Sequence, residues 1–468
     1  MDFLNRKEEI KWLSEMHAHS KKKLFPIVIY GPRRVGKTLL IRQFMRGKTA
    51  LYIYVNETKS SHVLAKEAAD AITAAEGLDE LVALDDWDKI LRYLVERSSF
   101  EIIVFDEFQN FLSVDKSVFG ILQNLIDRNE NRALMLVFLG SSTGMVKEVF
   151  EDASAALYGR IKAKLLMKPL AFREFYSGIR ALGYRDAVDI AGLFLIFGGY
   201  PKYLVALEDF EVGAKPLEDV VEFLFFTENA PLQNEVRDLL RAEFGNRGAQ
   251  NYSILEAIAT GHTKLSEISS YVGIPATSVS AFLNALCDYH GIVEKNIPLL
   301  RPAAKDTRYA IKNPMFRFWF RFVRPNESSL ELGRYELFKQ EFKRGFSTYA
   351  GREFERLAKE HLISSLKIGR IDFSELGSWW HKDREIDIIT LGKDACVWEC
   401  KWSIVDNRKA SDIALSLKEN ASYAGIRSPK LGLIAREIGN DARDYFDYAV
   451  SLGDIIEGKL PYGKRRDA

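Results

Sequence analysis

The chain has 468 residues, which is too long for one ordinary hydrophobic core, so about three domains are expected. Hydrophobic residues make up 47% and charged residues 28%, a balance typical of folded proteins that excludes an intrinsically disordered chain. Lysine and arginine number 66 against 65 aspartate and glutamate, so the net charge of +1 identifies no acidic or basic partner.

Cysteine usage and apolar runs exclude further classes. The three cysteines, Cys287, Cys396 and Cys400, are an odd number without paired-ligand spacing, so neither a disulfide framework nor a zinc site is predicted. The first residues lack the apolar stretch of a signal peptide, and no apolar run approaches the roughly 20 residues that span a bilayer. We therefore expect a cytoplasmic protein without a membrane partner.

The first elements in chain order are a helix and a buried strand. Asn5, with Glu8 three residues later, offers a helix start ahead of apolar positions. Residues 26–30 form a short apolar run that predicts a strand. The segment GPRRVGKT, residues 31–38, then matches G-x-x-x-x-G-K-[ST] and leads into a helical pattern.

This loop predicts a nucleotide-phosphate site at a helix N-terminus, where backbone N–H groups turn inward around the phosphates. Lys37 would reach the β- and γ-phosphates, and Thr38 would ligate Mg²⁺. Glycine is needed in the loop where a Cβ would clash. The predicted cofactor-binding residues here are Gly31, Pro32, Arg33, Arg34, Val35, Gly36, Lys37, Thr38 and Leu39. The alternative is a glycine turn that only joins a strand to a helix.

A second strand carries an acidic pair at its end. Residues 102–105 are apolar and run directly into Asp106 and Glu107. Asp106 would hold Mg²⁺ and its water shell, and Glu107 would polarise the attacking water as the catalytic base. Because binding alone needs no such glutamate, hydrolysis is predicted. ATP is the default nucleotide, since no N-K-x-D guanine motif follows.

A third strand, residues 134–139, is followed by Gly-Ser-Ser, which places a serine hydroxyl at the edge where α/β sheets bind ligands. Ser141 is therefore a candidate sensor of the γ-phosphate, with a helix cap by Ser142 or Thr143 as the alternative reading of this segment. A further strand at 50–56 and helical patterns near 60–75, 86–97 and 116–129 alternate with these elements. The fold class predicted for this half is α/β, a doubly wound parallel sheet.

These residues resemble the archaeal ATPases of the AAA+-related, STAND-like group. The resemblance rests on GPRRVGKT, VFDEFQ, LGSS, LYGR at 157–160, KPLAFREF at 168–175 and FGGYPKYL at 197–204. It implies an ATPase domain with a helical lid over residues 1–240, and it carries Arg160 over as a residue that meets the γ-phosphate. LYGR can equally be a helix-end turn. Gly198, Gly199 and Pro201 look like the family's GGxP element, either a backbone bend or a nucleotide contact.

Residues 241–325 predict a winged helix-turn-helix domain. Three short helical patterns cover 252–288, Gly273 lies in the turn before the third, and wing strands follow at 292–300 and 308–313. The candidate recognition helix, 276–289, has no lysine or arginine, so sequence-tolerant phosphate contact is favoured over base readout. The basic residues lie on the wing and beyond it: Lys295, Arg301, Lys305, Arg308, Arg317, Arg321 and Arg324. The alternative is a spacer or a regulatory interface.

An aromatic stretch follows the wing. Residues 315–322, MFRFWFRF, could stack nucleic-acid bases, although aromatic residues at this density are more often core.

Residues 326–468 predict a domain with a possible metal site. An amphipathic helix, GREFERLAKEHL, precedes a hairpin in which Asp387 lies on one strand and Glu399 and Lys401 share a face of the other. Asp387 and Glu399 would bind Mg²⁺, and Lys401 would orient water at a scissile phosphate. On this short pattern alone, the alternative is a solvated face.

This segment, over about residues 345–405, resembles a PD-(D/E)XK nuclease-like domain. The resemblance implies a restriction-endonuclease-like α/β fold, with Glu355 as the acidic residue of the helix. Glu353 is the rival for Glu355, and Glu385 is an alternative to Asp387.

The combined prediction is an ATP-binding and ATP-hydrolysing protein, with ATP and Mg²⁺ as cofactors, that couples its nucleotide state to a DNA-binding and DNA-cleaving C-terminal region. The alternative is an ATP-dependent switch or DNA-binding regulator whose nuclease-like domain is inactive. A homo-oligomer or regulation by a partner is expected in either case.

Overall fold

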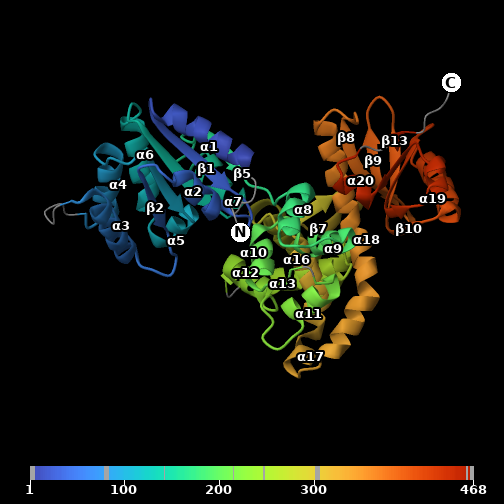
Figure 1. Cartoon of the computed structure of the whole chain (residues 1–468). Coiled ribbons are helices and arrows are strands. Elements are labelled where there is room, and N and C mark those ends of the chain that lie inside the picture. Colours follow the sequence, from blue (N-terminus) through green and yellow to red (C-terminus); the bar gives the residue numbers. More distant parts are fainter. Residues whose placement is uncertain are drawn as a thin grey trace. The chain divides into compact units, whose positions relative to one another are not determined.

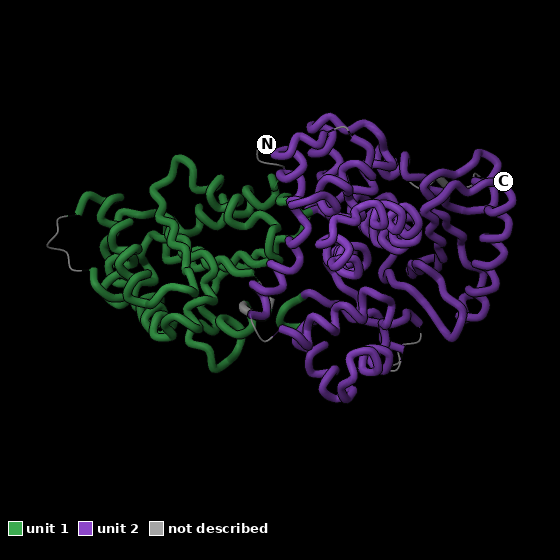
Figure 2. The backbone as a smooth tube through the Cα atoms, turned by 90° about the horizontal axis from the view of Figure 1, so that it is seen from below, with its two compact units in different colours: residues 1–169, 200–202, 288–291 green, residues 170–199, 203–287, 292–468 purple. Residues whose placement is uncertain are grey.

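The computed structural model describes residues 6–78, 84–141, 143–213, 215–245, 248–300, 306–459 and 462–463. Asn5, Ser142, Arg301 and Lys305 lie outside the described residues, as does the side chain of Thr143. The chain forms two compact units, shown in Figure 2. Unit 1 comprises residues 1–169, 200–202 and 288–291, and unit 2 comprises residues 170–199, 203–287 and 292–468.

A five-stranded parallel sheet forms the centre of unit 1, in the order β2-β3-β4-β1-β5. Its strands are β1 (Leu24–Tyr30), β2 (Ala50–Tyr54), β3 (Ile102–Asp106), β4 (Leu134–Gly140) and β5 (Ala163–Leu166). The central strands are buried along almost their whole length, as expected for a parallel sheet with both faces covered. The predicted parallel α/β fold of this half is therefore confirmed.

Helices cover both faces of this sheet because successive side chains of each strand point to opposite sides (Figure 1). Val28 of β1 joins the core on the face of α3 (Ser61–Glu76), α4 (Trp87–Glu96) and α6 (Ser117–Arg128). Ile27 and Ile29 of β1 join the core on the face of α1 (Lys7–Ser20) and α2 (Lys37–Met45). Strand β5 was not predicted, because it has four residues and its side chains are half-buried or exposed.

The first part of unit 2 is helical. Its lid helices are α8 (Phe172–Ala181), α9 (Ala187–Phe197), α10 (Pro201–Asp209), α11 (Leu217–Phe225) and α12 (Glu235–Phe244), with the first residues of α10 belonging to unit 1. The winged-helix segment follows as α13 (Ala249–Ala259), α14 (Leu265–Val272), α15 (Ala276–Asn284), β6 (Val293–Asn296) and β7 (Arg308–Ile311). The lid thus clusters with the rest of unit 2, although the sequence places it in one domain with the phosphate loop.

A long helix, α18 (Tyr335–Lys367), leads into the C-terminal sheet. This sheet has the order β13-β12-β11-β10-β9-β8. Its strands are β8 (Glu375–His381), β9 (Arg384–Leu391), β10 (Cys396–Val405), β11 (Lys430–Ile438), β12 (Tyr448–Ser451) and β13 (Tyr462–Gly463). The predicted hairpin is an antiparallel β8-β9-β10 meander, and α19 (Asn407–Tyr423) connects β10 to a parallel β11.

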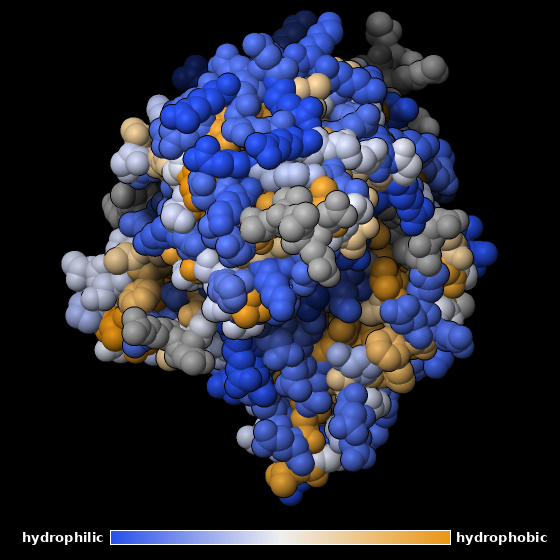
Figure 3. All heavy atoms as spheres, turned by 90° about the vertical axis from the view of Figure 1, so that its left-hand side faces the viewer, coloured by the Kyte–Doolittle hydropathy of each residue, from blue (hydrophilic) through white to orange (hydrophobic). Residues whose placement is uncertain are grey.

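The face of the molecule in Figure 3 is mostly hydrophilic, with apolar side chains scattered among polar ones. Within the described ranges, no helix combines the length and the apolar character that crossing a lipid bilayer requires.

Candidate nucleotide site and a second acidic cluster

The loop between β1 and α2 has an unusual backbone. Three of its residues have positive φ angles: Gly31 at 153°, Arg34 at 70° and Gly36 at 95°. A Cβ on Gly31 would lie 2.3 Å from the carbonyl oxygen of Met167, which directly follows β5. Glycine is thus required at this position for two reasons. The segment after β5 packs too closely to leave room for a Cβ, and the φ angle is positive.

Lys37, the first residue of α2, extends back into this loop. Its Nζ atom donates hydrogen bonds to the carbonyl oxygens of Gly31 at 2.8 Å and Pro32 at 3.2 Å. The side chain is only 7% exposed. A buried ammonium held at a helix N-terminus by neutral carbonyls creates a site of positive potential, which suits a polyphosphate.

The two predicted Mg²⁺ ligands are in direct contact. The Thr38 hydroxyl donates to Oδ2 of Asp106 at 2.8 Å, and the Tyr52 hydroxyl donates to the same oxygen at 2.5 Å. Burial, with the hydrogen bond to Asp106 and its negative charge, raises the pKa of Tyr52 well above its ordinary value, so the phenol stays protonated. A hydroxyl beside a carboxylate is the donor set that Mg²⁺ prefers, so these residues fit the ion.

Glu107 lies next to this pair in a left-handed conformation, with φ 53° and ψ 45°. The side-chain amide of Gln109 donates to the Glu107 carboxylate and, at 3.4 Å, to the Ser141 hydroxyl. Oε1 of Gln109 is buried and has no hydrogen-bond partner among the described residues. Strained backbone is often found at functional sites. Here Glu107, the predicted base, and Ser141, the predicted sensor, accept hydrogen bonds from the same Gln109 amide. Sequence reasoning missed Gln109, although it stands in the motif VFDEFQ.

Arg160 is not brought to this site. It lies before β5, at the amino edge of the sheet, whereas the phosphate loop follows the carboxyl end of β1. Its guanidinium forms two hydrogen bonds with the Asp127 carboxylate, at 2.9 and 2.7 Å. The role that the resemblance implies for Arg160 therefore has no support in this geometry.

The GGYP segment does reach the phosphate loop. A Cβ on Gly36 would lie 3.8 Å from Cγ of Pro201. Within unit 2, the Gly199 carbonyl accepts the Leu170 N–H at 2.7 Å, and a Cβ on Gly199 would overlap the Leu170 carbonyl. The segment is thus tightly packed at Gly199, and Pro201 lies near Gly36 of the loop.

Comparison with known proteins places two parts of the chain in described families. A family described as an ATPase domain predominantly from Archaea matches residues 3–207, and one described as archaeal and bacterial proteins of unknown function matches residues 319–413. An uncharacterized protein of Methanocaldococcus jannaschii is 30% identical over 466 residues, which are 98% of this chain and 97% of that protein. The chain belongs to this archaeal ATPase family.

Two further similarities concern parts of the chain. An uncharacterized ATP-binding protein of the same organism is 48% identical over 46 residues, covering 10% of this chain and 75% of that protein. The structure of a Walker-type ATPase of Pyrococcus abyssi is similar with a TM-score of 0.51 at 20% identity, covering 68% of this chain and 96% of that one. At this identity the likeness shows the fold alone.

A second polar cluster lies in unit 2, where α18, β9 and β10 meet. The β9–β10 ladder ends with Ile388 opposite Trp398, and the next residues in this register are Asp387 and Glu399. Oδ2 of Asp387 accepts the Cys400 N–H at 2.8 Å, in place of a strand partner. Lys401 donates to Glu399 at 2.5 Å. The structure therefore brings the predicted D-x₁₁-E-x-K residues together.

The carboxyl groups of this cluster repel each other in a partly dry environment. Burial, followed by the charges of Glu399 and Glu355, raises the pKa of Asp387 to about 8. Burial likewise raises the pKa of Glu355 to about 7, with Glu385 and Glu399 adding to the shift. Among the residues that the structure describes, no group of three or more His, Cys, Asp or Glu side chains is arranged to hold a metal ion. The Mg²⁺ site at Asp387 and Glu399, which needs only two carboxylates, stays a prediction.

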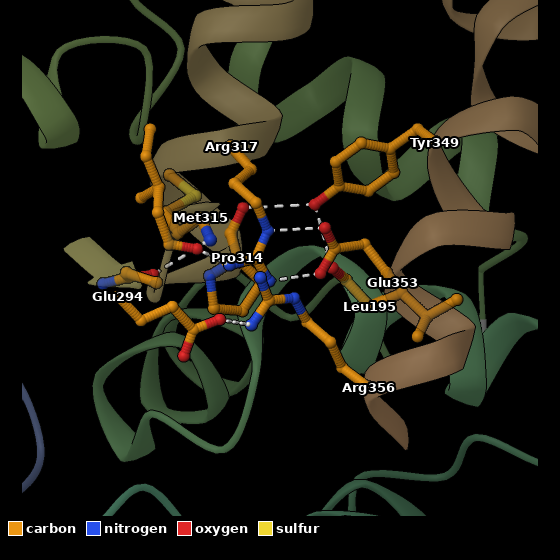
Figure 4. A network of polar contacts seen from close by, with 10 residues as sticks. Leu195, Glu294, Pro314, Met315, Arg317, Tyr349, Glu353 and Arg356 are labelled. Atoms are coloured by element: carbon orange, nitrogen blue, oxygen red, sulfur yellow. Dashed lines mark hydrogen bonds and ion pairs between the residues drawn. The ribbon is translucent and has the colours of Figure 1, made fainter. Parts of the chain in front are cut away.

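The rival residues on α18, Glu353 and Glu355, have different surroundings, and Figure 4 shows those of Glu353. Glu353 is buried in a two-bond ion pair with Arg317, and the neighbouring Tyr349 hydroxyl donates to the carbonyl oxygens of Leu195 at 2.9 Å and Pro314 at 3.1 Å. Glu353 therefore has a structural role in its ion pair with Arg317, whereas Glu355 interacts with the charges of the acidic cluster.

Several basic residues predicted to contact phosphates have internal partners instead. Arg317 is buried against Glu353, and Arg324 is shared between Glu327 at 2.5 Å and Glu256 at 3.5 Å. The aromatic stretch at 315–322 is likewise core, since all its aromatic residues are buried. The sequence could not show these partners, because most of them come from distant segments of the chain.

Proposed function

We propose that this protein hydrolyses ATP in the presence of Mg²⁺ and that its nucleotide state controls a DNA-acting region in the C-terminal part of the chain. The observation that carries the first half is the contact between Thr38 and Asp106 beside the buried ammonium of Lys37. These three groups supply the oxygen ligands and the positive charge that a bound Mg·ATP needs.

Each residue of the nucleotide site has a distinct role. Lys37 and the N–H groups of the loop bind the phosphates, and Thr38 and Asp106 would hold the metal ion. Bound Mg²⁺ supplies positive charge that offsets the charge developing on the phosphate oxygens. Glu107 orients the attacking water and accepts its proton on Oε1, because Oε2 already accepts the Gln109 amide.

The decisive test is ATP turnover by the wild type and by Glu107→Gln, each with and without DNA. The variant keeps the size and the hydrogen-bonding capacity of the side chain but cannot take a proton. Turnover should fall about a hundredfold or more, while ATP binding stays within about twofold. Equal turnover by the two proteins would remove Glu107 from the mechanism. Stimulation of the wild type by DNA would support the second half of the proposal.

For the C-terminal region we propose phosphodiester cleavage by Glu355, Asp387, Glu399 and Lys401. A second candidate function is binding without cleavage. In that second function the domain binds DNA without cutting it, as part of an ATP-dependent switch. Because the pKa values of Asp387 and Glu355 are raised in the metal-free cluster, binding of Mg²⁺ there has to displace protons, so metal-dependent cleavage is expected to strengthen as the pH rises.

Incubation of DNA with Mg²⁺ or Mn²⁺ between pH 6 and 9 separates these two functions. Cleavage that appears above the pKa of Asp387 and is absent in Asp387→Ala would support a nuclease. DNA retention without cleavage over the whole range, unchanged in Asp387→Ala and abolished in Lys37→Ala, would support the switch. Glu353→Gln is not a suitable control, since its partner Arg317 is buried.

A further inference from the structure

A cavity of about 460 Å³ lies in unit 2, between α12, α13 and the segment formed by η7 (Arg324–Asn326) and α17 (Glu327–Glu331). Its volume is in the range of small-molecule pockets, roughly 300–1,000 Å³. None of its described lining residues belongs to the phosphate loop or to the acidic cluster. Leu240 and Tyr252 contribute apolar surface to its wall, which also contains three arginines: Arg237, Arg241 and Arg324. The cavity is therefore a candidate binding site of its own.

One carboxylate orients two of these arginines. Oε1 of Glu327 accepts a hydrogen bond from Nη2 of Arg237, and Oε2 accepts one from Nη1 of Arg324 at 2.5 Å. Because a guanidinium has five N–H donors, Glu327 fixes both side chains and uses only a small part of their donors. Nε of Arg324 is buried and forms no hydrogen bond within the described part of the chain, although Oε1 of Glu256 lies 3.5 Å away. The ion pairs of Arg324 thus leave room for a further acceptor.

Arg241 adds a positive charge without a partner among the described residues. It is exposed and lies one helical turn after Arg237, on the same face of α12, where like charges repel each other. The lining thus carries three positive charges against the single negative charge of Glu327. Glu256, outside the lining, offsets a further part through Arg324. The cavity keeps a positive excess that favours an anion.

We propose that this cavity binds a phosphate monoester, carried either by a free small molecule or by the 5′ end of a DNA strand. A phosphate monoester has a charge of about −1.5 to −2 at pH 7, which offsets the positive excess more fully than one carboxylate does. Its oxygens accept the paired hydrogen bonds that guanidinium groups donate. The apolar wall at Leu240 and Tyr252 accommodates the organic group beside the phosphate. The site belongs neither to the nucleotide site nor to the acidic cluster.

The test measures the Kd of the full-length protein for ribose 5-phosphate by isothermal titration calorimetry. Every protein in it carries Lys37→Ala, which removes the ammonium of the phosphate loop. Ribose, which has no phosphate, and glutarate, a dianion without phosphate, are the comparison ligands. We expect only ribose 5-phosphate to bind, and Arg241→Gln should raise its Kd about tenfold, because a charge-assisted hydrogen bond is lost. Arg241 is exposed, so this variant should keep the Tm of its parent.

Arg408→Gln is the matched control. Arg408 is an exposed arginine of α19 in the same unit, and it likewise has no hydrogen bond or ion pair with a described residue. Its replacement removes the same charge and should leave the Kd within about twofold. Arg237→Lys keeps the charge beside Glu327 but loses the planar fork, so its Kd should lie between those of the parent and of Arg241→Gln.

Two oligonucleotides of one sequence, with a 5′ phosphate or a 5′ hydroxyl, distinguish the sources of the phosphate. Tighter binding of the phosphorylated strand that Arg241→Gln abolishes would identify a DNA end. Binding of ribose 5-phosphate without a difference between the strands would identify a free small molecule.

The proposal is overturned if neither phosphorylated probe binds, or if Arg241→Gln and Arg408→Gln have the same affinities. Equal affinity for glutarate and ribose 5-phosphate would overturn the assignment to phosphate. None of these outcomes depends on ATP turnover, so the function proposed for the nucleotide site stands or falls separately.

Discussion

Tyr52 and Asp106 are joined by a hydrogen bond of 2.5 Å between the neighbouring strands β2 and β3. The phenol and Thr38 both donate to the same carboxylate oxygen, so two hydroxyl groups fix the orientation of the predicted metal ligand. This arrangement makes Tyr52 part of the support of the nucleotide site, a role that its position in an ordinary strand does not reveal.

Tyr52→Phe removes only the hydroxyl group. We expect a several-fold fall in kcat/KM and a higher Mg²⁺ concentration for half-maximal turnover, because Asp106 loses one of the donors that orient it, at a cost of about 1 kcal/mol. A titration of ATPase activity with Mg²⁺ measures this. Tyr158→Phe, an exposed tyrosine that lies before β5 and away from the carboxyl ends of the strands, is the control and should follow the wild-type curve.

Gln109→Ala tests the amide that links Glu107 to Ser141. Because the amide orients the base and lies beside the reacting groups, kcat should fall about tenfold while the Kd for ATP changes by less than about twofold. Single-turnover measurements separate the two quantities. A change in Kd without a change in kcat would instead place Gln109 in nucleotide binding.

The raised pKa of Asp387 predicts a pH-dependent stability. Between the ordinary pKa of aspartate and about 8, the folded chain holds this proton more tightly than the unfolded chain does, so the free energy of unfolding falls as the pH rises through that window. Glu355, with its pKa near 7, adds to the same trend. Thermal unfolding of the wild type and of Asp387→Asn between pH 5 and 9 checks this. The variant should lose less Tm over the range, and parallel curves would contradict the prediction.

The ion pair of Arg317 and Glu353 predicts a large loss of stability when Arg317 is replaced, although the sequence suggests that Arg317 lies on a nucleic-acid-binding surface. Arg317→Ala leaves a buried carboxylate without its partner and should cost about 3–5 kcal/mol of stability, as measured by chemical denaturation. Arg308→Ala removes an exposed pair with Glu385 and should cost less than about 1 kcal/mol. Similar losses in the two variants would contradict the assigned burial.

Local patterns in the sequence predicted much of unit 1. The phosphate loop and the strand ends at Asp106 and Ser141 follow from short runs of residues whose spacing has a direct physical meaning. Strand β5 was not predicted because its side chains are half-buried or exposed, so its sequence shows no apolar run and no clear alternation. The winged-helix elements also lie close to their predicted positions.

What the sequence could not supply are the partners of charged side chains. Arg6 and Lys168 are 162 positions apart, and Arg317 and Glu353 are 36 positions apart. Neither pair has a spacing that a local pattern could detect. The same reason explains why Arg160 was assigned to phosphate, although its partner is Asp127.

The helix α18 carries one further consequence. Tyr349 donates to the Leu195 carbonyl of α9, and Glu353 accepts from Arg317. Arg356 pairs with Glu294 of β6, and Glu360 accepts the N–H of Phe172 at the start of α8. A truncation before this helix would leave Arg317 without its counter-ion and open the aromatic core beside it to water. The C-terminal third therefore helps to hold the middle third together, although the sequence alone suggests two separate domains. Fragments of either third should be cut so that they keep α18.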